Sequence, residues 1–90
     1  MNIQTPHERF IPLTPIASDT PVLFIDSQAP LLDLHFCASE RLHTVLDYLN
    51  LMACTKLRDS SEKDINTITN TARLLLQDTK DILAAIETRI

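Results

Sequence analysis

Apolar residues between positions 31 and 57 recur with the period of an α-helix. On a helical wheel of about 100° per residue, they fall in one arc about half a turn wide: Leu31, Leu34, Ala38, Leu42, Val45, Leu46, Leu49, Met52, Ala53 and Leu57. Polar residues such as Glu40 and Asp47 collect on the opposite side. The pattern predicts a helix over about residues 30–57 whose apolar face is wider than one neighbouring helix covers.

The ends of this helix carry recognisable signals. Ser27 is a good N-cap residue, whereas Pro30 favours the first helical position and would make Ala29 the cap, so the start stays open between the two. Residues 58–61 interrupt the apolar pattern, and we expect Asp59 to take up the turn there. Ser61 followed three residues later by a carboxylate is typical of a capping box, which opens the next helix.

A second helix is predicted over about residues 62–89. Its apolar residues form a stripe about a third of a turn wide, spaced alternately three and four apart: Ile65, Ile68, Ala72, Leu75, Leu76, Thr79, Ile82, Leu83 and Ile86. Because the link between the helices is short, we expect them to lie side by side and antiparallel.

Residues 1–26 are predicted to form an extended, proline-rich arm. Four prolines, Pro6, Pro12, Pro15 and Pro21, interrupt any helix there and favour extended backbone. Residues 22–25, VLFI, are a short β-favouring run that we expect to be ordered and buried. The run needs either a partner strand, such as the same run in a second chain, or a groove on the helices to hold it.

The two helical faces do not match, and this mismatch predicts the architecture. An isolated hairpin would leave several leucine-sized side chains of the first helix in water, which forfeits several kcal/mol at ~25 cal/mol per Å². Either residues 10–25 or a second copy of the chain must cover them. We expect an all-α protein whose antiparallel hairpin (residues 27–90) forms a homodimeric four-helix bundle. The predicted interface comprises Leu34, Ala38, Leu42, Val45, Leu49 and Met52.

Composition narrows the functional class. The chain of 90 residues contains no glycine, and phosphate-binding loops and nucleophile elbows depend on glycine. Cys37 and Cys54 would lie ~25 Å apart along one helix, so they cannot pair within a chain; we expect buried or half-buried free thiols. No run approaches the ~18 apolar residues of a membrane span. We therefore expect a cytoplasmic protein without a membrane segment.

Candidate chemistry is sparse. Ser39, His43 and Asp47 lie four apart on one polar strip, which lacks an oxyanion donor and shelter from water. Glu40 and His43 have the Glu-x-x-His spacing of di-iron bundles, but Glu40 points away from the apolar stripe and the second helix has no matching pair. The eight Lys and Arg residues are scattered among acids, and the net charge is −4. We expect no catalytic residues, no metal and no cofactor.

These observations favour a non-enzymatic interaction or regulatory module that self-associates and binds another, unidentified protein. A small nucleic-acid-associated regulator is one alternative, and it would need a basic surface assembled only in the oligomer. A metal-binding helical bundle is the other.

Several short segments resemble a group of short bacterial helical-hairpin proteins of unknown function. In that group a phenylalanine-containing strand precedes a helix containing Ala-Ser and then a helical hairpin. The segments here are LFI at 23–25, LL at 31–32, FCASERL at 36–42 and ARLLL at 72–76. The resemblance covers roughly residues 22–83 and departs from the group in lacking glycine between strand and helix. It implies a fold and no activity.

Overall fold

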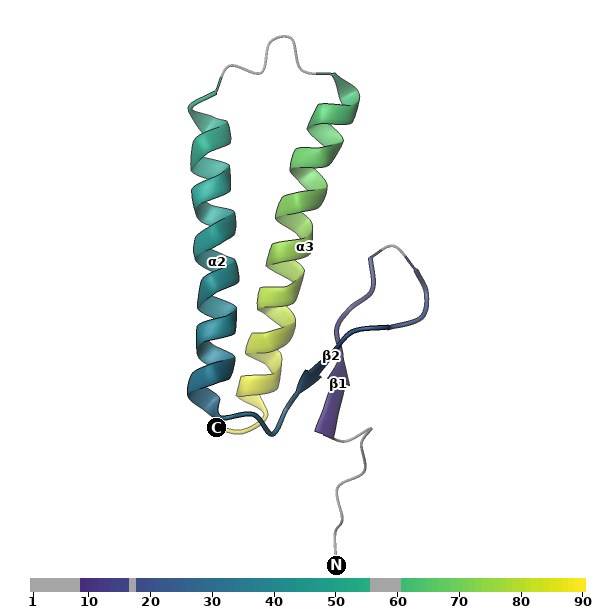
Figure 1. Ribbon diagram of the computed structural model, residues 1–90, viewed down its shortest axis with the longest axis vertical. Coiled ribbons are helices and arrows are strands. Elements are labelled where there is room, and N and C mark those ends of the chain that lie inside the picture. The colour runs from purple at the N-terminus through teal and green to yellow at the C-terminus, as the bar shows by residue number, and fades with distance from the viewer. Residues whose placement is uncertain (1–8, 17, 56–60) are drawn as a thin grey trace, which may run out of the picture.

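Two antiparallel helices form the body of the protein. The structure, a computed structural model, describes residues 9–16, 18–55 and 61–90. Its elements follow the order β1 (Phe10–Pro12), β2 (Phe24–Asp26), α2 (Leu31–Ala53) and α3 (Glu62–Glu87). Figure 1 shows α2 and α3 side by side with the strands near their lower ends, and the two helices pack against each other. The predicted pairing of two helices is therefore present.

The first helix starts where neither alternative placed it. Pro30 is itself the N-cap residue, in extended backbone with φ of −52° and ψ of 136°, and no side chain caps the helix. Ser27 instead donates its hydroxyl to the carbonyl of Arg9, 2.5 Å away. The serine that looked like a cap is therefore a tether for the N-terminal segment, and proline marks the helix start without needing an N–H partner.

The helix ends form without any left-handed residue. None of the described residues has positive φ, in keeping with a chain that has no glycine. Cys54 ends α2 in right-handed backbone, with its N–H directed to the carbonyls of Asn50 and Leu51. Ser61 and Asp64 form the predicted capping box at the start of α3, with distances of 3.1 and 3.3 Å. Asp59, the expected turn residue, lies outside the described residues.

A small two-stranded sheet forms within residues 9–27. β1 and β2 are antiparallel, with Ile11 opposite Ile25, and bonds from Leu13 to Leu23 and from Ser27 to Arg9 extend the ladder. The partner strand of the β-favouring run thus comes from earlier in the same chain and not from the same run in a second chain. Only Ile25 of residues 22–25 is buried, so the expectation that the whole run is buried is wrong. Alternation explains this, because successive side chains of a strand face opposite sides.

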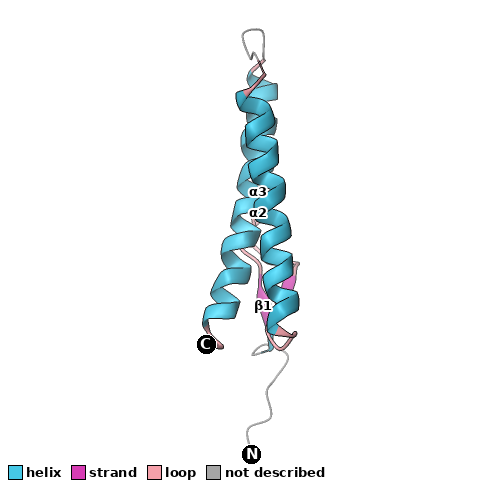
Figure 2. Cartoon of the chain, turned by 90° about the vertical axis from the view of Figure 1, so that its left-hand side faces the viewer, coloured by secondary structure: helices cyan, strands magenta, loops and turns pink. Residues whose placement is uncertain are grey.

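The N-terminal segment, which we define as residues 9–29 (residue 17 excepted), is fastened to the lower half of the hairpin. Both the N–H and the hydroxyl of Thr14 donate to the Asp81 carboxylate, at 2.8 and 3.1 Å. The guanidinium of Arg89 donates to the carbonyls of Ser27, at 3.1 Å, and Ala29. Figure 2 shows the strands beside the end of the hairpin where α2 begins and α3 ends.

The hydrophobic core lies at this fastened end. Its buried members come from β2, α2 and α3, with Ile11, Leu13, Ala29 and Ile86 packed around them: Ile25, Leu34, Ala38, Ile82 and Ala85. Both free cysteines are exposed, so the expectation of buried or half-buried thiols is wrong. No described helix is long and apolar enough to cross a membrane.

Candidate functional site

One side of each helix is buried in the contact between α2 and α3. On α2 the buried residues are Leu34, Ala38 and Val45, and on α3 they are Thr79, Ile82 and Ala85. Val45 is the most deeply buried, at 1 % exposure. This seam takes one edge of each apolar stripe, and the side chains toward the other edge remain outside it.

Large apolar side chains at that edge form an exposed surface, which we call the leucine face. On α2, positions 42, 46 and 49 follow the four-and-three spacing of one helix side; on α3, positions 65, 76 and 83 do the same at spacings of eleven and seven. The members are between 40 and 52 % exposed. The leucine face consists of Leu42, Leu46, Leu49, Ile65, Leu76 and Leu83.

The leucine face lies on the opposite side of α3 from the N-terminal segment. The segment contacts α3 through Asp81, and it lines hollows with Leu74 and Asp78. Asp78 is two positions after Leu76, and two positions correspond to about 200° around a helix. The N-terminal segment therefore leaves the leucine face uncovered.

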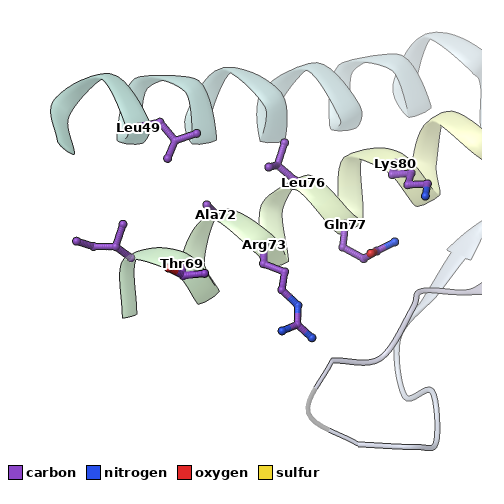
Figure 3. A pocket seen from close by; sticks show the side chains of 8 residues that line it. Leu49, Thr69, Ala72, Arg73, Leu76, Gln77 and Lys80 are labelled. Atoms are coloured by element: carbon purple, nitrogen blue, oxygen red, sulfur yellow. The ribbon is translucent and has the colours of Figure 1, made fainter. Parts of the chain in front are cut away.

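The surface is hollowed where the two helices meet. Leu49 from α2 and Ile68, Ala72 and Leu76 from α3 line an open groove of about 510 Å³. Figure 3 shows Leu49 and Leu76 pointing toward each other across it, with Lys80 farther along α3. A second hollow of about 380 Å³ continues past Leu76 to Leu83.

Polar groups border the α3 side of the groove. Thr69, Arg73, Gln77 and Lys80 line its edge, and Glu87 borders the hollow beyond. Ala72 is small, so it lets another element approach the α3 backbone closely at the middle of the groove. An apolar centre with a polar rim is the usual anatomy of a protein–protein interface.

The six residues predicted as an interface fall into a buried group and an exposed group in the structure. Leu34, Ala38 and Val45 are buried inside the single chain, and Met52 is half-buried. Leu42 and Leu49 are exposed members of the leucine face. Four further members, listed above, were not in the predicted set. The helical wheel of residues 31–57 could have identified Leu46, because Leu46 lies near the outer edge of the apolar arc. The members on α3 could be identified only once the contact between the two helices was known.

The residues weighed for catalysis lie at the surface. His43 and Asp47 are exposed and Ser39 is half-buried. Among the described residues, no group of three or more His, Cys, Asp or Glu side chains is placed to hold a metal ion. The leucine face itself carries no carboxylate or imidazole among its six members.

Among the described residues, Arg9 and Asp26 form an ion pair in which both pKa values are shifted, and this pair holds the sheet together. Arg9 meets the carboxylate of Asp26 through two bonds of 2.9 Å. The hydrogen bond from Arg9 is the main reason why the pKa of Asp26 lies below its ordinary value of 3.8, and the same bond raises the pKa of Arg9. A guanidinium that grips both carboxylate oxygens is a positioning device. It joins the residue before β1 to the end of β2.

A smaller hollow of about 260 Å³ lies between sheet and hairpin. Phe24, Leu34 and Cys37 are among its lining residues, and Arg41 pairs with Asp78 at its edge, 3.5 Å apart. The pair joins α2 to α3 at the surface, where such contacts contribute little.

Comparison with known proteins finds no matching family model, no curated relative and no solved structure of similar fold.

Proposed function

We propose that this chain is a non-enzymatic interaction module whose hairpin self-associates through the leucine face into a four-helix bundle. The observation that carries the proposal is the gathering of six large apolar side chains, each 40–52 % exposed, on one face of two helices. Single exposed leucines are common on protein surfaces, but a contiguous set over two elements marks a binding surface.

The layer structure supports the same conclusion. A helix buries its apolar stripe against another element, and stable domains stack two or more layers. The protein is flat, because its Cα atoms extend 61 Å along the longest axis and 13 Å along the shortest. On the side of the leucine face this chain supplies no second layer from its described residues.

The size of the surface fits a second copy. The 23 residues of α2 span ~35 Å, and two neighbouring helices are ~20 Å wide, which gives a face of ~700 Å². A standard stable interface buries ~800 Å² on each partner. Each half-exposed leucine returns ~1 kcal/mol when it is fully covered, because complete burial is worth ~2 kcal/mol. A second hairpin presents the same area and the same apolar content.

A covering role for the N-terminal segment would compete with this proposal. That segment is tied to the other side of α3 by the bonds from Thr14 to Asp81. Moving the N-terminal segment onto the leucine face would break both hydrogen bonds and remove Ile11 and Ile25 from the hydrophobic core. A second copy covers the face without this cost.

We place the dimer in the cytoplasm, where exposed thiols such as Cys37 and Cys54 stay reduced. The self-associated bundle would then bind a further protein partner, for which the outward-facing N-terminal segment, with Val22 at 77 % exposure, is available.

Sedimentation equilibrium of the full chain over a range of concentrations tests the proposal. The expected mass is twice the 10.2 kDa of one chain. Replacing Leu49 with Asp should return the mass to that of one chain, whereas the same change at Leu51, on another side of α2, should leave the dimer intact. A single-chain mass for the unaltered protein at the highest concentration would reject self-association.

The two alternative functions have tests of their own. A nucleic-acid regulator would be retained on heparin at low salt and released as salt rises. A metal-binding bundle would carry a stoichiometric metal in elemental analysis of protein purified without chelators. The interaction module should show neither.

A further inference from the structure

The α3 part of the leucine face has the same spacing in both directions along the helix once Ala72 of the groove is included. On α3 its apolar positions, together with Ala72 in the groove, are spaced seven, four and seven residues apart: Ile65, Ala72, Leu76 and Leu83. This spacing is a palindrome centred on position 74. A surface that pairs with its own copy about a two-fold axis needs such a pattern, because every contact then occurs twice.

The pattern on α2 has its centre at the same height. Leu42, Leu46 and Leu49 are spaced four and three apart, so their centre lies at Leu46. Residues at one level of the two antiparallel helices have numbers that total about 120, as Arg41 with Asp78 and Leu49 with Ala72 illustrate. Position 46 is therefore level with position 74, and one axis serves both helices.

From this symmetry we infer that two copies pack leucine face to leucine face and head to tail, about a two-fold axis perpendicular to the helices at the level of Leu46. This inference rests on the proposed function and specifies the arrangement of its dimer. Each α3 then crosses the α3 of the second copy, and each α2 crosses its α2. Ile65 faces Leu83 of the other copy, and Ala72 faces Leu76.

The alternative two-fold axis runs along the helices and gives a poorer match. It would set α2 of one copy against α3 of the other at equal levels. Leu83 would then lie near His35, and Ile65 near Ala53, so both outer members of the α3 pattern would lose a large apolar partner. The perpendicular axis pairs the same two residues with each other.

The rim is compatible with the perpendicular axis. Lys80 faces Ile68 and Thr69 of the other copy, in a stretch that carries no charge between Asp64 and Arg73. Arg73 lies within one turn of its own symmetry mate. Both guanidinium groups sit at the groove edge, where solvent and salt screen their repulsion.

Cysteine cross-linking tests the arrangement. In a chain with Cys37→Ser and Cys54→Ser, which removes the two exposed thiols, the single changes Thr69→Cys and Lys80→Cys are made in separate preparations. One preparation carries an affinity tag, so that mixed dimers are distinguished by size. The two are mixed, equilibrated and mildly oxidised.

Positions 69 and 80 face each other across the proposed axis, whereas two copies of position 69 are ~15 Å apart along the helices. Because a disulfide needs Cα atoms within ~7 Å, the mixture should give at least about tenfold more linked dimer than either preparation alone. Leu51→Cys, outside the leucine face, is the matched control and should link with neither.

The outcomes separate this inference from the proposed function. A dimeric mass with cross-links between two copies of position 69, or with no cross-link in the mixture, would overturn the head-to-tail arrangement and leave self-association standing. A single-chain mass for all preparations and for the unaltered protein would reject both.

Discussion

Replacing Leu46 is the most informative perturbation of the proposed interface. Its side chain is 52 % exposed in the single chain, so about half of its apolar surface is free to be covered by a second copy. Completing that burial is worth about 1 kcal/mol per copy, or about 2 kcal/mol per dimer, because Leu46 occurs on both sides. Leu46→Ala should therefore weaken the dimer about 30-fold.

Leu46→Asp should have a much larger effect. At the level of the two-fold axis it would bring two carboxylates together in an apolar contact, and removing each from water costs several kcal/mol. No dimer should persist at micromolar concentration. The monomer should keep its fold, because an exposed Asp within a helix costs only about 0.7 kcal/mol in propensity relative to the best helix former.

Sedimentation equilibrium and circular dichroism, measured on the same samples, give the two readouts. Leu51→Asp is the matched control, since Leu51 is on the same helix and 61 % exposed but lies about 140° around from Leu46. The variant at 46 should be a helical monomer and the variant at 51 a helical dimer. A dimer for Leu46→Asp with the affinity of the unaltered protein would show that Leu46 lies outside the interface.

Three further predictions concern the fold that carries the surface. Ser61→Ala should remove the α3 cap and lower the free energy of unfolding by about 1 kcal/mol in urea titrations; an unchanged midpoint would count against the cap. Asp81→Ala should remove the two hydrogen bonds that Thr14 donates, so the amides of β1 and β2 should exchange hydrogen faster whereas those of α2 should not. Equal changes in the strands and in α2 would show that other contacts hold the N-terminal segment. The Asp26 carboxyl should titrate below pH 3.8 by NMR and move upward in Arg9→Gln. Because folding lowers the pKa of Asp26, its contribution to stability should be present above pH 4 and be lost as pH falls through the folded-state pKa. An Asp26 pKa that stays the same in Arg9→Gln would contradict this.

Much of the helical architecture was predictable because its causes are local. The apolar period sets the two helices, and Ser61 with Asp64 sets the start of the second. The pairing of the strands was harder to predict. Residues 22–25 show β preference, but a strand's partner depends on chain pairing that no local pattern encodes, and the partner proved to be Phe10–Pro12.

The candidate site was predictable in part. The width of the α2 stripe predicted that α3 would leave part of it uncovered, yet it could not say which leucines α3 covers. Val45 and Leu46 are adjacent in sequence and on the wheel's apolar side, but Val45 is 1 % exposed and Leu46 is 52 % exposed. A rotation of α2 by one residue would exchange them, and only packing against α3 fixes that rotation.

The two cysteines show the same limit, because local sequence does not determine how exposed a side chain is. A free cysteine in an apolar helix is usually buried, but Cys37, which lines the same hollow as Phe24, is exposed.

The most direct test of the central claim is an isotope-filtered NOE measurement on a mixture of methyl-labelled and unlabelled chains. We expect contacts between copies from the methyl groups of Leu42, Leu46 and Leu83, and none from Leu51. An absence of contacts between copies from all three leucines, at a concentration where the protein is fully associated, would contradict this expectation.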